Sequence, residues 1–265
     1  MRMQIPIVLA YHKITNKVDF GINTIKIAKF KEQIGLIAKL GYNPTTFHRI
    51  EQGENNSGKS IVIVFDDGYE DCYTDAAPVL KTFGFPAVIF PVINYIGKYN
   101  LWEPFFLQRK FKHMTKEQLI ELSREGYEIG SHGFNHLYLP GLDEDILQQE
   151  ISDSKKILED WLGNEVITFC YPYGYFNRKI YTCVQNAGYH YAVAAPKLIY
   201  RDPITNFTIP KQSIYATDSL SMLTKKINNI KSLSWPTLSQ WLIQKGAFAS
   251  IALNSAKKLL KSTLY

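Results

Sequence analysis

The chain alternates short apolar runs with segments in which apolar residues recur at helical spacing. Short runs rich in β-branched residues are typical of strands buried on both faces, and apolar residues three or four positions apart are typical of amphipathic helices. The pattern predicts strands within residues 5–12, 60–68, 86–93, 127–136, 166–174 and 189–196. It predicts helices within residues 26–42, 75–85, 115–127, 142–163 and 177–188.

Residues typical of helix ends support these boundaries. Thr115 and Gln118 have the spacing of a capping box, in which each side chain accepts a hydrogen bond from the other residue's backbone N–H. Gly84, Gly126 and Gly163 each follow a predicted helix, where glycine readily adopts the left-handed conformation that ends it.

The alternation of strands and helices predicts an α/β fold with parallel strands and right-handed crossovers. Six or seven strand–helix units are visible, which is too few for a regular eightfold barrel. We therefore expect an incomplete or distorted β/α barrel, with a doubly wound open sheet as the alternative. In either fold, chemistry takes place at the carboxyl ends of the strands.

Charge is distributed unevenly along the 265 residues. The net charge is +6, yet residues 211–265 hold eight lysines, no arginine and a single acid, Asp218. We predict a barrel domain over residues 1–220 and a basic helical tail over residues 221–265. A lysine-rich segment is attracted to anionic surfaces, although a solvated face is the alternative. Without arginine for bidentate reading of bases, a nucleic-acid partner is not expected.

The end of the tail could form an amphipathic helix. Over residues 246–265, Phe248, Leu259 and Leu260 share a narrow side with two alanines, and three lysines follow in the second half. Such a helix can lie on an anionic membrane surface, or it can pack against the barrel or a partner chain.

Cysteines and apolar segments give expectations about location. The three cysteines, Cys72, Cys170 and Cys183, do not have the spacing of a disulfide framework or a zinc knuckle. The N-terminal apolar run, residues 5–10, is shorter than that of a signal peptide, and no segment is long enough to span a membrane. We expect a cytoplasmic protein, with peripheral contact to the inner membrane as an option.

Two strand ends carry candidate metal ligands. Asp66 and Asp67 end the strand at residues 60–68, and two adjacent buried carboxylates are costly unless a cation binds them. His132 and His136 follow a second strand. Two imidazoles, one carboxylate and a water are the ligands of a catalytic zinc site. Because successive strand residues face opposite ways, the turn at Gly68 must rotate one carboxylate for both to reach the site.

Other motifs fit less well. Residue 133 is glycine rather than glutamate, so the histidine pair is not the metalloprotease motif. Residues 66–75 lack the alternating oxygen ligands and the distal glutamate of a calcium loop. A pair of polar loop histidines that binds no metal stays an alternative.

Three segments resemble, in order, the first three motifs of the polysaccharide deacetylase family, carbohydrate esterase family four: "FDDGYEDCY", "SHGFNHLYL" and "CYPYG". The resemblance covers roughly residues 5–215 and implies a distorted (β/α)7 barrel with parallel strands that removes acetyl groups with a divalent metal, most simply zinc, with cobalt, nickel or manganese as alternatives. It implies that Asp66 is the general base and that the metal ligands are Asp67, His132 and His136. It also implies that the backbone N–H of Tyr173, next to Pro172, binds the oxyanion.

Two positions depart from the family pattern. Many members carry arginine two residues before the proline of the third motif, where it holds the base, and this chain has Cys170 there. The late Leu-x-His motif that supplies the catalytic acid is missing, since no histidine lies after His190. We assign the acid to His12, because "VLAYHKI" resembles the N-terminal Tyr-His of the branch that deacetylates biofilm poly-N-acetylglucosamine. His190 is the weaker candidate, and His12 as a purely structural histidine is the alternative.

Aromatic residues cluster near the predicted strand ends. Trp102 and the tyrosines around Pro172 are expected to contact sugar rings, although each could equally be a hydrophobic cover of the barrel. The leading prediction is a metal-dependent deacetylase of N-acetylated sugars in a cell-surface polysaccharide, a lipid-linked saccharide or lipopolysaccharide. A catalytically silent sugar-binding protein on the same fold is the alternative.

Overall fold

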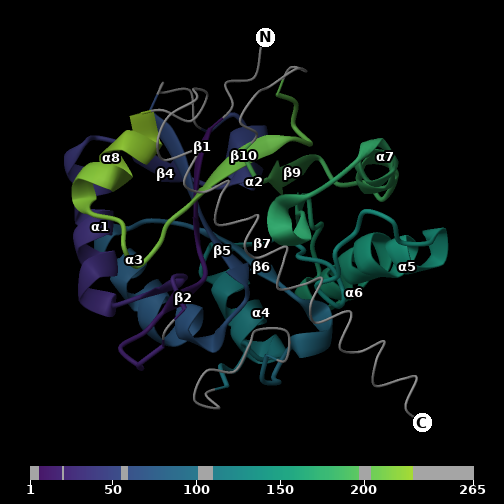
Figure 1. The fold of residues 1–265 in the computed structure, drawn as a ribbon, viewed down its shortest axis with the longest axis horizontal. Helices are drawn as coiled ribbons and strands as arrows, with labels where there is room; N and C mark the ends of the chain where they lie inside the picture. The colour runs from purple at the N-terminus through teal and green to yellow at the C-terminus, as the bar shows by residue number, and fades with distance from the viewer. Residues whose placement is uncertain (1–5, 20, 55–58, 101–109, 197–203, 229–265) are drawn as a thin grey trace.

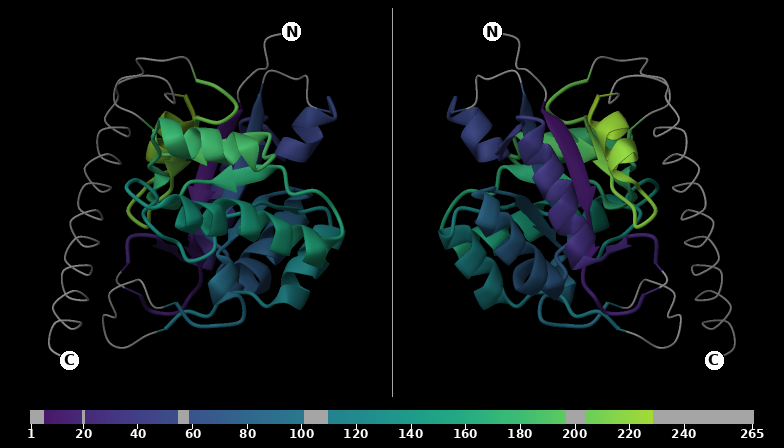
Figure 2. Two further views of the ribbon diagram at one scale, coloured as in Figure 1. Left: turned by 90° about the vertical axis from the view of Figure 1, so that its right-hand side faces the viewer. Right: turned by 90° about the vertical axis from the view of Figure 1, so that its left-hand side faces the viewer.

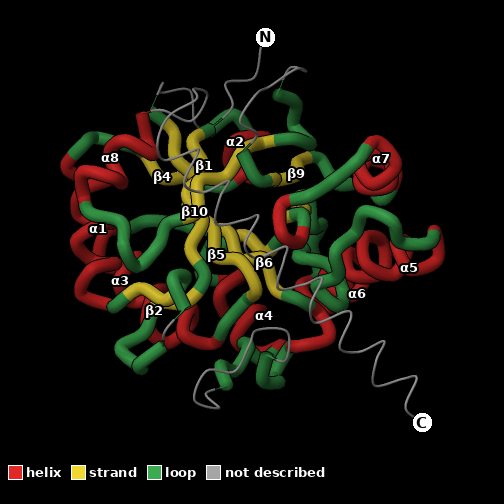
Figure 3. Tube along the Cα trace, in the orientation of Figure 1, coloured by secondary structure: helices red, strands yellow, loops and turns green. Residues whose placement is uncertain are grey.

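Seven parallel strands form the centre of the structure and helices surround them (Figure 1, Figure 3). The computed structural model describes residues 6–19, 21–54, 59–100, 110–196 and 204–228. The strands are β1 (Ile7–Tyr11), β5 (Ser60–Asp67), β6 (Val88–Pro91), β7 (Glu128–Ile129), β8 (Thr168–Cys170), β9 (Tyr191–Ala194) and β10 (Ile209–Ser213). Their spatial order is β7-β6-β5-β1-β10-β9-β8.

A single bridge joins the two ends of this sheet. Ser131, just after β7, pairs in parallel with Phe169 of β8. The Ser131 N–H donates to the Thr168 carbonyl at 2.9 Å, and the Cys170 N–H donates to the Ser131 carbonyl at 2.8 Å. The sheet is therefore a nearly closed barrel. The predicted distorted (β/α)7 barrel is confirmed, and the open-sheet alternative is wrong.

Three short strands lie outside the barrel circuit. β4 (Asn43–Thr45) pairs with β5, whereas β2 (Lys13–Ile14) and β3 (Thr24–Ile25) form a separate two-stranded ladder. The helices are α1 (Ile27–Lys39), α2 (Phe47–Glu51), α3 (Ala77–Phe83), α4 (Lys116–Arg124), α5 (Glu144–Gln148), α6 (Ser154–Leu162), α7 (Arg178–Asn186) and α8 (Leu220–Asn228).

The helix ends follow the residues that predicted them. Both hydrogen bonds of the Thr115–Gln118 capping box are present at the start of α4. Gly84 and Gly163 end α3 and α6 in the left-handed conformation, with φ of 66° and 69°. The long helix predicted within residues 142–163 is interrupted, because a π-helical turn, Gln149–Asp153, joins α5 to α6.

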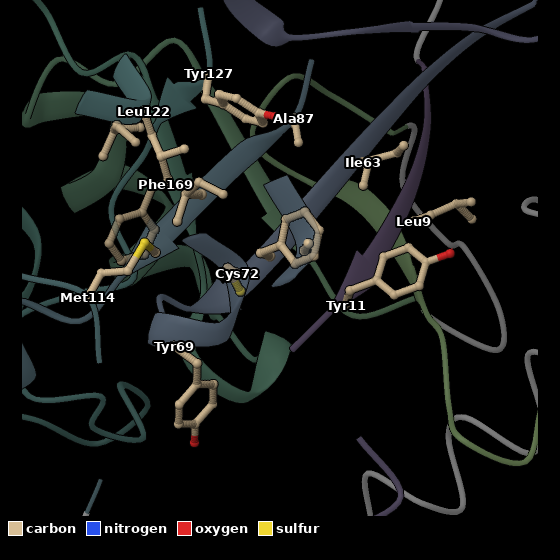
Figure 4. Close-up of a cluster of buried hydrophobic side chains, with 14 of the residues drawn as sticks. Leu9, Tyr11, Ile63, Tyr69, Cys72, Ala87, Met114, Leu122, Tyr127 and Phe169 are labelled. Atoms are coloured by element: carbon tan, nitrogen blue, oxygen red, sulfur yellow. The ribbon is translucent and has the colours of Figure 1, made fainter. Parts of the chain in front are cut away.

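Side chains alternate between the inside and the outside of the barrel. Along β1 and β5, Leu9, Tyr11 and Ile63 pack outward against the helices, as Figure 4 shows for the outer cluster. The inner cluster takes the intervening positions: Val8, Ala10, Val62, Val64, Val88, Phe90, Ile167, Cys170, Val193 and Ile209. Because the strand repeat is two residues, this alternation decides which side chains at the strand ends face the barrel axis.

The predicted runs did not include β2, β3, β4, α2 or β10, and α8 lies at the start of the predicted helical tail. β10 completes the barrel between β1 and β9, and α8 packs beside α1 with Leu223 and Ile227 buried (Figure 2). Lys226 of α8 is also buried and pairs with Asp218. The first residues predicted as tail thus contact the barrel. The division at residue 220 stays a prediction, because residues 229–265, including the predicted helix at 246–265, lie outside the described chain.

No helix within the described ranges combines the length and apolar character needed to cross a membrane.

Candidate metal centre and catalytic residues

Five side chains take inward-facing positions at the carboxyl ends of the strands. Asp66 of β5 continues the inward series of Val62 and Val64, and Lys211 of β10 continues that of Ile209. The same alternation places the other members inward: His12 after β1, His132 after β7 and Cys170 at the end of β8. All are buried except His12, whose side chain is 17% exposed.

Asp67 reaches the same site through an unusual backbone conformation. Its strand position would point the side chain outward, but its φ is +69°, and φ of the following Gly68 is +72°. A Cβ atom on Gly68 would lie 2.8 Å from the Pro91 Cα atom, so a side chain there would clash as well as strain the turn. The prediction that the turn at Gly68 rotates one carboxylate is confirmed.

His113 supports this turn, although no motif in the sequence pointed to it. Its side chain is fully buried, and its Nδ1 lies 2.9 Å from the Asp67 carbonyl oxygen, the geometry of a donated hydrogen bond. The ring packs on Tyr69 at a centroid distance of 4.6 Å. Burial lowers the pKa of His113 to about 4, so its ring is neutral at pH 7.

Asp67, His132 and His136 form a triad with the spacing of metal ligands. The Nε2 atoms of His132 and His136 lie 3.6 Å and 3.4 Å from Asp67 Oδ1. These distances are too long for good hydrogen bonds. Ligand atoms about 2.0–2.2 Å from a tetrahedral zinc ion lie about 3.3–3.6 Å from one another, so the residues present fit such an ion.

The two imidazoles are held in the state that a metal requires. His132 Nδ1 lies 2.7 Å from the Cys170 carbonyl oxygen, so this nitrogen donates and Nε2 keeps its lone pair toward Asp67. Burial lowers the pKa of His132 to about 4 and lowers that of His136 well below its usual value. Both rings are therefore neutral at pH 7 and able to bind a cation.

Asp66 lies beside this triad and is paired with the buried ammonium group of Lys211. The Lys211 ammonium donates to Asp66 Oδ2 and lies 2.9 Å from Cys170 Sγ, while His12 Nε2 lies 3.7 Å from the same Asp66 oxygen. Burial alone would raise the pKa of Asp66, but the charges of Lys211, His12 and His132 outweigh it and hold this pKa well below its ordinary value. Asp66 is an ionised carboxylate at neutral pH.

Lys211 pairs with Asp66 from β10, and Cys170 stands where the family pattern has an arginine. In the sequence, Lys211 is the first lysine of the lysine-rich segment 211–265, whereas the structure buries it to 5% exposure inside the barrel. The available signal was a lysine in "FTIPKQSI", whose apolar residues flank it like those of a strand.

The third motif forms a tight turn next to the triad. Tyr173 has a φ of +58°, and its ring centroid lies 4.6 Å from that of His136. Pro172 is buried at the start of this turn. A Cβ atom on Gly174 would lie 2.4 Å from the Ala195 Cβ atom, so only glycine fits there. Trp102, predicted to contact sugar, lies outside the described residues.

His190 does not take part in this site. It precedes β9, at the opposite end of the barrel from the strand ends that carry the triad, and its Nδ1 lies 2.8 Å from Glu51 Oε1 on the surface. Of the two histidines considered for the acid role, only His12 lies beside Asp66.

The fold and the cluster define a class: a parallel β/α barrel whose strand ends carry an Asp–His–His triad beside a second, separate aspartate. The chain belongs to the polysaccharide deacetylase family, whose model matches residues 53–192.

Curated proteins agree with this membership. The chain is 31% identical over 192 residues to the putative polysaccharide deacetylase YxkH of Bacillus subtilis, a match that covers 70% of this chain and 63% of that protein. It is 31% identical over 134 residues to a peptidoglycan-N-acetylglucosamine deacetylase of Bacillus cereus, covering 51% and 55%. The chain thus spans less than two thirds of either relative.

The fold is also similar to that of a polysaccharide deacetylase from Bacillus cereus known by crystal structure. The TM-score is 0.71 at 22% identity, and the match covers 84% of this chain and 69% of the other. At this identity the likeness concerns the fold.

Proposed function

We propose that the protein is a metal-dependent deacetylase that hydrolyses the N-acetyl groups of sugars in a cell-surface polysaccharide, a lipid-linked saccharide or lipopolysaccharide. The observation that carries the proposal is that the neighbouring aspartates, Asp66 and Asp67, have different partners. Asp67 faces two neutral imidazoles, whereas Asp66 is paired with an ammonium and a third histidine. Family membership and a relative named for peptidoglycan N-acetylglucosamine support the substrate class.

Asp67, His132 and His136 would hold the divalent ion. We propose zinc, with cobalt, nickel or manganese as alternatives, because two nitrogens and one carboxylate oxygen suit all four ions. When bound, the ion lowers the pKa of a water molecule and polarises the acetyl carbonyl.

Asp66 and His12 would move the protons. Asp66, ionised and inward-facing, accepts the proton of the attacking water as general base. His12, in its imidazolium form, then donates a proton to the departing amine, a task that suits the near-neutral pKa of histidine. The 3.7 Å between His12 Nε2 and Asp66 Oδ2 supports this pairing, because it brings both groups to one reacting centre.

The third-motif turn would bind the reacting carbonyl. We propose that the backbone N–H of Tyr173 donates to the developing oxyanion and that Pro172 and Trp102 contact the sugar. The position of the Tyr173 ring beside His136 supports the first assignment. A fixed N–H donor of this kind contributes about 3–4 kcal/mol to such reactions.

Acetate release from N-acetylglucosamine oligomers by the zinc-loaded full chain tests the proposal. Asp66→Asn keeps the shape of the side chain but cannot accept a proton, so it should retain zinc and lose activity by about 10²–10⁴-fold. The chelated wild-type chain should also be inactive. A zinc-loaded wild-type chain that binds these oligomers without releasing acetate would identify a silent binding protein instead.

For the location, we propose the cytoplasm with peripheral contact to the inner membrane, and the lysines within residues 229–265 support the membrane contact. The full chain should float with anionic vesicles at low salt, and a chain ending at Asn228 should not. Equal behaviour of the two would remove the proposal.

A further inference from the structure

A second group of potential metal ligands overlaps the triad. Asp66, His132 and Cys170 offer one ligand atom each, all within 4.8 Å of one another and all buried. This set shares His132 with the Asp67 triad. A thiolate, an imidazole and a carboxylate together are good ligands for zinc, so ligand chemistry alone does not choose between the two sets.

Lys211 lies inside the second group. Its ammonium donates to Asp66 and lies 2.9 Å from Cys170 Sγ, and the Cys170 sulfur lies 3.5 Å from Asp66 Oδ1. An ion bound by Asp66 and Cys170 would therefore have to displace a buried positive charge. By contrast, the atoms that face one another in the Asp67 triad are a carboxylate oxygen and two imidazole nitrogens.

We propose that Lys211 is a built-in cation that directs the metal to Asp67, His132 and His136 and keeps Asp66 unligated. Its second effect rests on the proposed function: an Asp66 that binds no metal stays available as the general base. Lys211 is thus a positioning residue, which acts through Asp66 and Cys170.

The preference of the metal for the Asp67 triad follows from the balance of charges in a buried site. With Lys211 in place, the Asp66 carboxylate is already compensated, and a second cation there would meet like-charge repulsion in a medium of low polarity. Without Lys211, a buried carboxylate and a thiol are left without this cation, and a zinc ion is the most effective replacement. Because the two ligand sets share His132, gain at one set comes at the expense of the other.

Zinc X-ray absorption on the full-length chain reads out the ligands directly, without turnover. Wild type should show only nitrogen and oxygen at about 2.0–2.2 Å. Lys211→Met, which keeps length and removes charge, should show one sulfur at about 2.3 Å. Adding Cys170→Ser to Lys211→Met should remove the sulfur again. A sulfur ligand in wild type, or none in folded Lys211→Met, would overturn the proposal.

Two further variants separate the effect of the Lys211 charge from poor folding and from the general loss of a buried ion pair. Lys211→Gln also removes the charge but can still donate a hydrogen bond to Asp66, so it should gain the sulfur ligand even where Met folds poorly. Lys226→Met removes another buried lysine, which pairs with Asp218 away from the site, and should keep wild-type zinc ligation. A sulfur ligand in Lys226→Met would show that loss of a buried ion pair, rather than of Lys211, moves the metal.

The effect on the base has a separate readout. Lys211→Met/Cys170→Ser has zinc back on nitrogen and oxygen but lacks the cation beside Asp66. Its kcat should fall about 10–100-fold with an unchanged KM, the usual cost of losing a supporting partner. A wild-type kcat would remove the positioning role. An inactive wild type with the predicted zinc ligation would instead contradict only the proposed function.

Discussion

At the residue scale, two adjacent aspartates reach the same site by different routes because their backbones differ. Asp66 has the extended conformation of β5 and keeps the inward direction of Val64, whereas Asp67 turns inward only through its positive φ. Such a conformation costs about 1–3 kcal/mol in a residue other than glycine and persists only where surrounding contacts enforce it. Here Gly68 and the hydrogen bond from His113 supply those contacts.

The buried Asp66–Lys211 pair gives a prediction for stability. Lys211→Met should lower the free energy of unfolding of the metal-free chain by about 3–5 kcal/mol, because it leaves a buried carboxylate without its partner. The double variant Asp66→Asn/Lys211→Met removes both charges and should lose much less. Denaturant titration of both single variants and the double variant measures the coupling. Additive losses would show that the pair is not a unit.

The sequence motifs predicted most residues of this site but did not predict Lys211. Asp66 and Asp67 are adjacent in the sequence, and His132 and His136 lie four residues apart. Because each pair is close along the chain, its spacing was enough to predict a shared site. Lys211 lies 145 residues from its partner Asp66, and an isolated lysine has the character of a surface charge. Only the closed barrel brings the two together.

At the element scale, apolar patterning identified the elements with continuous apolar faces. β1, β5, β6, β8 and β9 all lie within the predicted runs, and so do the main helices. β10 was missed because its five residues, "IPKQS", include a proline and three polar residues, all of them buried. The long helix is interrupted at Glu150. The Glu150 carboxylate accepts hydrogen bonds from the N–H groups of Phe134 and Asn135, which lie between His132 and His136.

The third-motif turn gives a prediction about packing. Gly174→Ala introduces a Cβ atom 2.4 Å from Ala195 Cβ and strains a φ of +75°. Gly163→Ala is a matched control, with a φ of +69° and no atom within 4 Å of the new Cβ. Thermal unfolding should show Gly174→Ala about 1–3 kcal/mol less stable than the control, which is the usual cost of overpacking. Equal losses would show that the turn can move away from Ala195.

A loop contact gives a prediction for pH. Asp71 accepts a hydrogen bond from the Ile14 N–H of β2, and burial raises the pKa of its carboxyl to about 7. Between about pH 4 and pH 7 the folded chain therefore binds a proton that the unfolded chain has lost. This contribution to stability is present at low pH and is lost as the pH rises through 7.

Asp71→Asn keeps the acceptor oxygen and cannot ionise, so it isolates this effect. The stability of the metal-free wild type relative to Asp71→Asn should fall by up to about 4 kcal/mol from pH 4 to pH 8, since each pKa unit corresponds to about 1.4 kcal/mol. Asp153→Asn, at a half-exposed carboxylate, serves as control. A pH-independent difference between wild type and Asp71→Asn would contradict the assignment.

At the scale of the whole molecule, barrel closure creates the site. The candidate ligands come from the ends of β5 and β7, and the groups beside them come from β1, β8 and β10, so no part of the chain shorter than the barrel contains the full set. Alternating strands and helices predicted this architecture. The sequence offered no signal for the closing bridge at Ser131, which is a single backbone pairing.

Removal of the metal should therefore lower the free energy of unfolding of the whole barrel. Zinc at 100 times its dissociation constant should stabilise the chain by about 2.7 kcal/mol relative to the chelated form. His136→Ala should lose most of this gain, whereas His190→Ala, at an exposed histidine at the other end of the barrel, should keep it. Equal stabilisation of both variants would place the zinc elsewhere.

Anomalous diffraction at the zinc edge, from crystals of the zinc-loaded full-length chain, would locate the metal ion itself. We expect one peak, bound by Asp67, His132 and His136, with Asp66 held by Lys211 and not bound to the metal. A peak between Asp66 and Cys170, or no peak at the triad in zinc-loaded crystals, would contradict this expectation.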